Sequence, residues 1–380
     1  MLFSRGFLAP VLIPIALPGS VFANDGRERA EEALRTLQGY YNDGTGLWNT
    51  IGWWNGANCM TAIANLALID PSVVETADYV FNNTLNKAPP SNPNPGPEVK
   101  TNSGKRSFST RAANPVNASE WLDSAYDDDA WWALAWIAAY DVTEDNTYLT
   151  LAEDIFAALV KAWGTRCGGG GIYWNPTDSY INAITNELFL SVAAHLANRV
   201  PSKKTEYVQW AIKEWDWFTA QGFFGQNHTI NDGLLDNCEN NGATVWSYNQ
   251  GVVLGGLVEL NKAAPDDTYL ESANTIAKAA IDTLADSNHV IHDWCETSSC
   301  EPDGTQFKGI FIRNLEMLQR ASPSDLYKSV IENSANSIWE NDRNDQGQFG
   351  VNWAGPANVG KIDASTHSSA FDALVAAAAI

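Results

Sequence analysis

The sequence is poor in several features that define large classes of protein. Lysine and arginine number 23 against 45 aspartates and glutamates, which gives a formal net charge of −22. Such an acidic chain is poorly suited to bind nucleic acid, anionic polymers or an acidic membrane surface. Beyond the N-terminal segment, no stretch approaches the ~18 uninterrupted apolar residues that suggest a transmembrane helix. We therefore expect a water-soluble mature chain with a neutral ligand.

Cysteine is also scarce, and five cysteines are too few for a disulfide scaffold. Cys295 and Cys300 lie five residues apart around the loop C-E-T-S-S-C, and we expect them to form a disulfide. The pairing of Cys59, Cys167 and Cys238 stays open, since one cysteine must remain single. No C-x-x-C or H-E-x-x-H spacing is present, so the sequence predicts no metal site.

The first 23 residues resemble an export signal. Arg5 supplies a positive charge, a short apolar stretch covers residues 7–17, and a small-residue cleavage site ends at Ala23. A membrane anchor is the alternative, but this apolar stretch is too short to span a bilayer and contains two prolines. We expect a secreted protein of residues 24–380. Three N-x-[ST] sequons are expected to carry glycans on surface loops: Asn82, Asn117 and Asn227.

Most of the mature chain has the periodicity of helices joined by short polar loops, and no period-2 strand run stands out. The exception is an irregular segment at about 87–117, rich in proline, asparagine, serine and glycine. Four segments begin alike with tyrosine and follow one another at spacings of 59, 62 and 58 residues; they start at Tyr148, Tyr207, Tyr269 and Tyr327. A more apolar helix precedes each of them. A period near 60 with two helices per repeat indicates stacked helical hairpins.

The repeat extends to both ends of the chain and gives about twelve helices in six hairpins. The added helices are expected at 27–41, 54–69, 72–85 and 364–379. An all-α fold with six inner and six outer helices, an (α/α)6 barrel, fits this count as a single domain over 24–380. An open solenoid is the alternative. The inner helices are apolar all round, which favours the closed ring because an open array would leave one of their faces wet.

The stretch Y-D-D-D-A-W-W places three consecutive carboxylates one alanine ahead of two tryptophans of an inner helix. A simple explanation is helix capping, with Ser124 and Asp127 forming a variant capping box. A cap needs one carboxylate, however, and adjacent aspartates at a helix end can hold their carboxyl groups roughly 5–6 Å apart, the separation found in retaining glycosidases. Repulsion in a partly dry site would then leave one carboxyl ionised and the other protonated. The spacing does not distinguish the pair Asp127 and Asp128 from the pair Asp128 and Asp129.

Tryptophan and a recurring polar set point to a carbohydrate. The chain has 16 tryptophans, most of them expected in the core, and two or three are expected to stack on sugar rings in a cleft. Polar side chains recur where inner helices begin, and although any one of them could be a helix cap, their repetition suggests a neutral, hydroxyl-rich ligand. His367 could hydrogen-bond a sugar or serve as an acid/base, but a structural histidine is equally plausible. The candidate binding residues are Trp54, Asn58, Asp129, Trp131, Asn186, Glu187, Tyr248, Gln250 and His367.

Six ordered motifs together resemble glycoside hydrolase family 76: YDDDAWWALAWIAAYD, CGGGGIYW, NAITNELFLSVAAHL, WSYNQGVVLGGLVEL, FKGIFIRNL and THSSAFDAL. The resemblance covers nearly the whole mature chain. It implies an (α/α)6 barrel and an endo-acting, retaining α-1,6-mannanase without a metal or organic cofactor. The family's catalytic pair falls on Asp127 as nucleophile and Asp128 as acid/base. Asp129 is left a supporting or substrate-binding role.

Two other functions stay open at this point. The family also contains fungal cell-wall proteins thought to transfer glycan-anchored proteins onto wall polysaccharide, so transglycosylation of a mannose-containing glycan is one alternative. A non-catalytic mannan-binding protein is the other, although the intact aspartates speak against it. The sequence ends in AFDALVAAAAI, without a polar spacer and separate apolar tail of a lipid anchor. We expect a monomer that is extracellular or associated with the cell wall.

Overall fold

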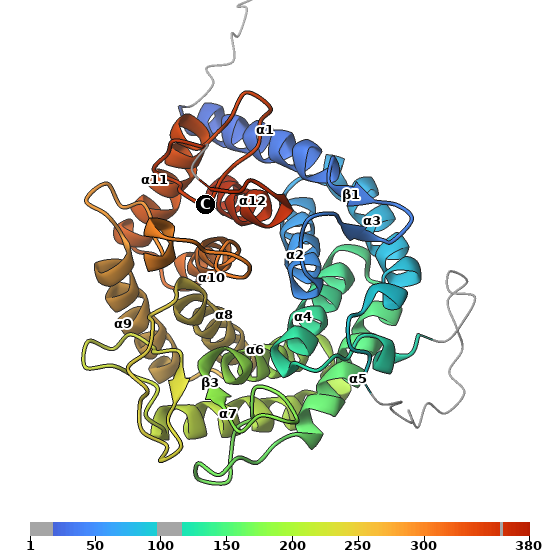
Figure 1. Cartoon of the computed structure of the whole chain (residues 1–380), viewed down its shortest axis with the longest axis vertical. Helices are drawn as coiled ribbons and strands as arrows, with labels where there is room; N and C mark the ends of the chain where they lie inside the picture. Colours follow the sequence, from blue (N-terminus) through green and yellow to red (C-terminus); the bar gives the residue numbers. More distant parts are fainter. Residues whose placement is uncertain (1–17, 97–115, 358–359) are drawn as a thin grey trace, which may run out of the picture.

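The computed structural model describes residues 18–96, 116–357 and 360–380, and within these ranges it contains twelve α-helices in two concentric rings (Figure 1). The inner ring consists of α2 (Trp53–Ile69), α4 (Tyr126–Thr143), α6 (Ala183–Arg199), α8 (Ser247–Ala263), α10 (Phe307–Ala321) and α12 (Ala364–Ala379). The outer ring consists of α1 (Pro18–Gln38), α3 (Val74–Lys87), α5 (Asn146–Lys161), α7 (Lys204–Ala220), α9 (Asp267–Leu284) and α11 (Asp325–Asn341). The predicted (α/α)6 barrel is confirmed.

Burial distinguishes the two rings. In α6, 14 of 17 residues are buried, whereas only six of the 17 residues of α7 are buried. The first and last inner helices, α2 and α12, pack against each other, and α12 also packs against α1. The N–H of Ala364 donates to Oγ1 of Thr50 at 3.2 Å across this junction. The ring is therefore closed, and the open solenoid is excluded.

Glycine allows the inner helices to approach closely. A Cβ atom at Gly251 in α8 would lie 2.5 Å from Cα of Phe311 in α10. A Cβ atom at Gly309 in α10 would lie 2.4 Å from the carbonyl oxygen of Ser369 in α12. Because real Cβ contacts are longer than this, larger residues at these positions would push apart the helices that line the barrel.

Strands make up very little of the described chain. A two-residue hairpin pairs β1 (Tyr41–Asn42) with β2 (Leu47–Trp48), and a second antiparallel pair joins β3 (Ile181–Asn182) to β4 (Gly233–Leu234). The first hairpin explains why the helix expected at 27–41 ends at Gln38: Tyr41 already pairs with Trp48. The same helix begins earlier than expected, at Pro18.

The loops of the two mouths of the barrel differ in length. Connections from an inner helix to the next outer helix are short: the shortest covers residues 144–145, and the longer ones are like that at residues 200–203. Connections from an outer helix to the next inner helix are long: the shortest covers residues 39–52 and the longest residues 88–125. All the long loops therefore gather at the mouth where the inner helices begin, which we call the loop mouth. We call the other end the short-loop mouth. Long loops on a rigid scaffold are common positions for functional residues.

Several local predictions can be placed on this fold. The disulfide between Cys295 and Cys300 is confirmed, and a second one joins Cys167 to Cys238, which leaves Cys59 buried and single. Residues 1–17 of the expected export signal and residues 97–115 of the irregular segment lie outside the described residues. Among the sequons, Asn82 and Asn227 are exposed and Asn117 is partly exposed, so glycosylation stays a prediction. No helix in the described part of the chain is long and apolar enough to cross a bilayer.

Candidate functional site

The three consecutive aspartates lie in the first turn of α4, at the loop mouth. Asp127 and Asp128 are partly exposed, whereas Asp129 is only 2% exposed. The residue at the N-cap is Ala125, and no side chain caps the helix there, so the capping box expected from Ser124 does not form. Helix capping therefore does not explain the three consecutive carboxylates.

The side chain of Asp129 stabilises the turn that leads into α4. Its Oδ1 accepts a hydrogen bond from the backbone N–H of Asp123 at 2.7 Å. Oδ1 of Asp123 in turn accepts from the N–H of Ala125 at 2.6 Å. Because Asp129 is buried and holds this turn, Asp127 and Asp128 are left as the adjacent pair with access to the mouth.

The protein gives these two carboxyl groups different proton affinities. Burial is the main factor that raises the pKa of Asp127 to about 7, and a hydrogen bond from the side chain of Trp174 favours its ionised form. Burial also raises the pKa of Asp128 well above its usual range, assisted by the charges of Asp127 and Asp123 and by a hydrogen bond to Asp123. Asp127 therefore ionises first, while Asp128 keeps its proton next to an acceptor.

Aromatic rings from four inner helices contact one another at the same mouth. Trp54 of α2 stacks on Trp131 of α4 with ring centroids 5.9 Å apart, and its Nε1 donates to Oδ1 of Asp303 at 3.0 Å. Tyr248 of α8 stacks on Phe307 of α10 at 3.7 Å. The charge of Asp127 is among the causes that raise the pKa of Tyr248, after burial and the charge of Asp232. Trp54, Trp131 and Tyr248, all three expected from the sequence, thus lie in one neighbourhood.

Amide side chains near the start of two inner helices hold the backbone of the long loops. Oδ1 of Asn186 accepts from the N–H of Ile172 at 2.8 Å, and its Nδ2 donates to the Ile172 carbonyl at 3.1 Å. Gln250 makes the same two contacts with Ile230, at 2.9 and 2.8 Å. Both amides were expected to bind a ligand. The structure instead shows them engaged in positioning the α5–α6 and α7–α8 loops.

His367 does not reach the mouth. It is completely buried, its Nε2 lies 2.8 Å from the carbonyl oxygen of Ala33, and its Nδ1 accepts from the N–H of Phe349. Burial lowers its pKa to about 4, so the ring is neutral at ordinary pH. Of the two roles considered from the sequence, the structure supports the structural one.

Asn58 and Glu187 are buried in the barrel interior. Nδ2 of Asn58 donates to the carbonyl of Trp54 at 3.2 Å, and its Oδ1 accepts from Arg313 at 2.6 Å. Glu187 is 1% exposed and neither of its carboxyl oxygens has a hydrogen-bond partner in the protein. Burial, assisted by the charge of Asp232, raises the pKa of Glu187 well above its usual range. Glu187 is therefore a neutral acid with an unused donor, whereas Asn58 supports the backbone beneath Trp54.

Sequence reasoning missed four residues of this neighbourhood. Asp123 precedes Asp127 by four positions, and its carboxyl group could have been noticed as part of the same acidic segment. Trp174 lies in the quoted motif CGGGGIYW. Phe307 begins the quoted motif FKGIFIRNL, whereas Asp303 carries no local signal. Only closure of the ring brings these two side chains to Trp54 of α2.

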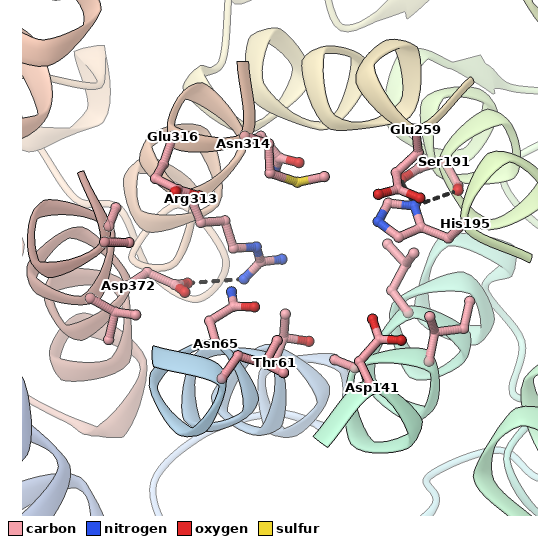
Figure 2. Close-up of a pocket in the computed structure, with 18 of the residues that line it drawn as sticks. Thr61, Asn65, Asp141, Ser191, His195, Glu259, Arg313, Asn314, Glu316 and Asp372 are labelled. Atoms are coloured by element: carbon pink, nitrogen blue, oxygen red, sulfur yellow. Dashed lines mark hydrogen bonds and ion pairs between the residues drawn. The ribbon is translucent and has the colours of Figure 1, made fainter. Parts of the chain in front are cut away.

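The short-loop mouth contains a separate cavity of about 280 Å³ (Figure 2). Arg199 lies 2.6 Å from Asp141 and 2.8 Å from Glu259, while Arg313 lies 2.9 Å from Asp372. Figure 2 shows Arg313 and Asp372 on one side of the cavity and Glu259 and Asp141 on the opposite side. The charged side chains of this cavity are paired with one another, and the cavity lacks two adjacent carboxyl groups with different pKa values. The chemistry of the chain is therefore concentrated at the loop mouth. In the described ranges, no cluster of three or more histidine, cysteine or acidic side chains could hold a metal ion.

Comparison with known proteins gives relatives over part of the chain and similar folds over nearly all of it. A Schizosaccharomyces pombe protein is 34% identical over 224 residues, which are 54% of this chain and 50% of its own length. The Candida albicans mannan endo-1,6-alpha-mannosidase DCW1 is 30% identical over 224 residues, 53% of this chain and 48% of its own. The matched segments thus span about half the length of these relatives.

Solved structures with a similar fold have lower sequence identity. The Lin0763 protein from Listeria innocua has a TM-score of 0.76 at 24% identity, covering 93% of this chain and 97% of its own. An inactive variant of the alpha-1,6-mannanase GH76A of Salegentibacter sp. HEL1_6, in complex with alpha-1,6-mannotriose, has a TM-score of 0.74 at 19% identity, covering 93% and 99%. These two likenesses show the fold. The model of glycosyl hydrolase family 76 matches residues 27–379, and the chain therefore belongs to this family.

Proposed function

We propose that this protein is a retaining endo-glycosidase that cleaves α-1,6-mannosidic linkages in a mannan backbone. The Asp127 carboxylate attacks the anomeric carbon and the bond from that carbon to the leaving oxygen breaks, while Asp128 gives its proton to that oxygen. Asp128, now ionised, takes a proton from a water molecule whose oxygen attacks the same carbon. This step releases a mannan fragment whose new reducing-end mannose keeps its original α-configuration, and it frees Asp127.

One observation carries the proposal: two adjacent, partly exposed carboxyl groups at the loop mouth have different proton affinities. The nucleophile has to be ionised and the acid protonated, which is the order that burial and the Asp123 hydrogen bond give to Asp127 and Asp128. The inactive Salegentibacter mannanase carries asparagine in place of two consecutive aspartates. That variant supports a consecutive pair in the family, and the burial of Asp129 favours Asp127 and Asp128 here.

The substrate would be held by the aromatic rings around this pair. Trp54 and Tyr248 are partly exposed and offer flat apolar surfaces to sugar rings, whereas Trp131 is 3% exposed and supports Trp54 by stacking on it. The neutral acid Glu187 has a donor for a hydroxyl group. Residues 24–380 would form the catalytic domain of a secreted or cell-wall-associated enzyme. A fungal relative with a mannosidase name is consistent with this assignment.

The proposal is tested by incubating the protein with unbranched α-1,6-mannan and following product length and anomeric form. We expect internal cleavage to a range of shorter oligosaccharides, with the α-anomer appearing first in the NMR spectrum. Products longer than a starting oligosaccharide would identify transglycosylation, in which a sugar hydroxyl replaces water. Initial release of the β-anomer would disprove the retaining mechanism, and binding of mannan without new reducing ends would disprove catalysis.

The pH dependence of kcat/KM should depend on Asp123. We expect a bell-shaped profile with its acid limb at about pH 7, where Asp127 ionises, and its alkaline limb higher, where Asp128 loses its proton. Asp123→Asn removes a negative charge that raises the pKa of both groups. Both limbs should therefore move to lower pH, the alkaline limb more, because Asp128 also loses a hydrogen bond to a carboxylate.

The control for this profile is Asp178→Asn, which changes an exposed aspartate on the α5–α6 loop of the same mouth. It should leave both limbs where they are in the wild type. An alkaline limb that stays in place in Asp123→Asn would show that Asp123 does not influence the acid/base group.

A further inference from the structure

An exposed tryptophan stands on the α9–α10 loop at the loop mouth. Trp294 is 56% exposed, and the other strongly exposed tryptophan of the described chain, Trp174 at 38%, belongs to the same mouth. Leaving a large aromatic side chain in water forfeits the stabilisation that its burial would provide. An exposed indole beside a carbohydrate site therefore needs an explanation other than folding.

The protein fixes the backbone of this tryptophan on both sides. The preceding residue, Asp293, is buried and accepts hydrogen bonds from the N–H and hydroxyl of Ser247 at the start of α8, at 2.9 and 2.6 Å. Glu296, two positions after the tryptophan, accepts from the buried ammonium of Lys308 in α10. A disulfide between Cys295 and Cys300 closes the same turn. The indole is thus presented from a fixed support, as a preformed binding surface requires.

A continuous row of rings connects Trp294 with the candidate catalytic site. The centroids of Trp294 and Trp246 are 5.6 Å apart, and Trp246 lies 5.2 Å from Phe307. Phe307 lies 6.3 Å from Trp54, which stacks on Trp131 in the helix that carries the aspartates. Trp294 is therefore the exposed outer end of a row of ring contacts that reaches the helix of Asp127 and Asp128 through the buried rings of Phe307 and Trp131.

The mouth is hollowed beside this outer end. An open hollow of about 650 Å³ is lined by Trp294 together with polar side chains that include Thr244, Thr297 and Asn352. A flat indole face with hydroxyl and amide groups next to it matches the two faces of a pyranose ring, one apolar and the other rich in hydroxyls. The hollow has the composition of a sugar-binding surface.

We propose that Trp294 is a distal platform that stacks on a mannosyl unit of the glycan, several units away from the bond that is cleaved. This platform rests on the proposed function, because its ligand is the chain cut at Asp127 and Asp128. It would bind the extension of a long substrate and leave a short one untouched. The protein would therefore select long mannan segments over short oligosaccharides.

The test compares the dissociation constants of α-1,6-mannotriose and α-1,6-mannohexaose by calorimetry. It uses the full chain carrying Asp127→Asn and Asp128→Asn, so that hydrolysis does not interfere. In this background, Trp294→Ala should reduce the gain in affinity from triose to hexaose by about fivefold to tenfold. Trp294→Phe should keep most of the gain, because a ring remains. The control is Leu235→Ala, which changes a 47% exposed side chain of the same mouth outside the ring row and should leave the gain unchanged.

The outcomes separate the platform from the proposed function. If the wild type hydrolyses mannan and Trp294→Ala keeps the full gain with chain length, the platform is disproved and the mannanase stands. If the wild type releases no products and the asparagine variant binds neither oligosaccharide, the proposed function fails and the platform fails with it. A loss of the gain in Leu235→Ala as large as in Trp294→Ala would also overturn the specific role of Trp294.

Discussion

Replacing Asp127 by asparagine is expected to lower kcat on α-1,6-mannan by at least about 10⁴-fold while the protein stays folded. The amide has nearly the same size as the carboxyl group but cannot attack the anomeric carbon. The substitution also removes a carboxyl group whose pKa burial raises, so it adds no unpaired charge. Initial rates of reducing-end release, together with a circular dichroism melt of both proteins, measure this effect.

The two aspartates can be told apart by rescue with azide on an aryl α-mannoside. In Asp127→Ala, azide can replace the missing nucleophile and should give the β-mannosyl azide, with inverted configuration. In Asp128→Ala, Asp127 still forms the covalent intermediate, and azide should then give the α-mannosyl azide. The opposite pair of products would exchange the two roles.

Asp129→Asn is the matched control within the same run. An asparagine Oδ1 can still accept the hydrogen bond from the N–H of Asp123, so the turn before α4 should persist. We expect kcat to stay within about tenfold of the wild type, because Asp129 is buried and does not touch the substrate in this mechanism. A loss in Asp129→Asn as large as in Asp127→Asn would contradict the supporting role of Asp129, and full activity in Asp127→Asn together with that loss would assign the catalytic pair to Asp128 and Asp129.

The fold could be predicted from the sequence because its determinants are local and repeated. A spacing near 60 residues together with helices that are apolar all round already requires an inner ring. The structure agrees, since 14 of the 17 residues of α6 are buried. The ends of elements were less predictable. The first helix stops at Gln38 because a two-residue hairpin forms behind it, and two-residue strands leave no periodicity to detect.

The candidate site could be predicted only where its residues lie together in the chain. The aspartates, Trp131 and Tyr248 each belong to a helix start that stands out by composition. Asn186 and Gln250 stood out for the same reason, yet they bind the backbone of Ile172 and Ile230. The backbone of a loop that packs over a helix end needs hydrogen-bond donors and acceptors, as the hydroxyl groups of a sugar do, and an amide side chain provides both. Composition cannot distinguish these two partners; only the course of the loop does.

Removing the buried cation beneath the aromatic surface should have the largest effect on stability. Arg313 in α10 is 8% exposed, donates to Asp372 at 2.9 Å and to Asn58 at 2.6 Å, and lies 5.7 Å from the ring centre of Trp131. Arg313→Ala would leave the carboxyl group of Asp372 buried without its cation. We expect a loss of about 3–5 kcal/mol in the free energy of unfolding at pH 7, measured in urea.

The pH dependence of this loss follows from the carboxyl group that is left behind. Burial raises the pKa of Asp372 to about 6 even with Arg313 present, and its pKa should rise further without the cation. A carboxyl group with a raised pKa in the folded state stabilises the fold below its unfolded pKa and loses that contribution as the pH rises through its folded value. The destabilisation by Arg313→Ala should therefore grow between pH 5 and pH 8, and adding Asp372→Asn should recover part of it at pH 8.

The same helix offers a matched control for this prediction. Arg320 pairs with Glu316 at 2.6 Å, but its side chain is 60% exposed, so Arg320→Ala should cost no more than about 1 kcal/mol at any pH in this range. Equal losses in the two variants would show that burial of the Arg313 pair does not determine its contribution. Because Trp131 lies next to both Arg313 and Trp54, a partly folded Arg313→Ala protein should also bind mannotriose more weakly, whereas Arg320→Ala should not. This difference would connect the polar interior of the barrel to the aromatic surface on which the glycan is proposed to lie.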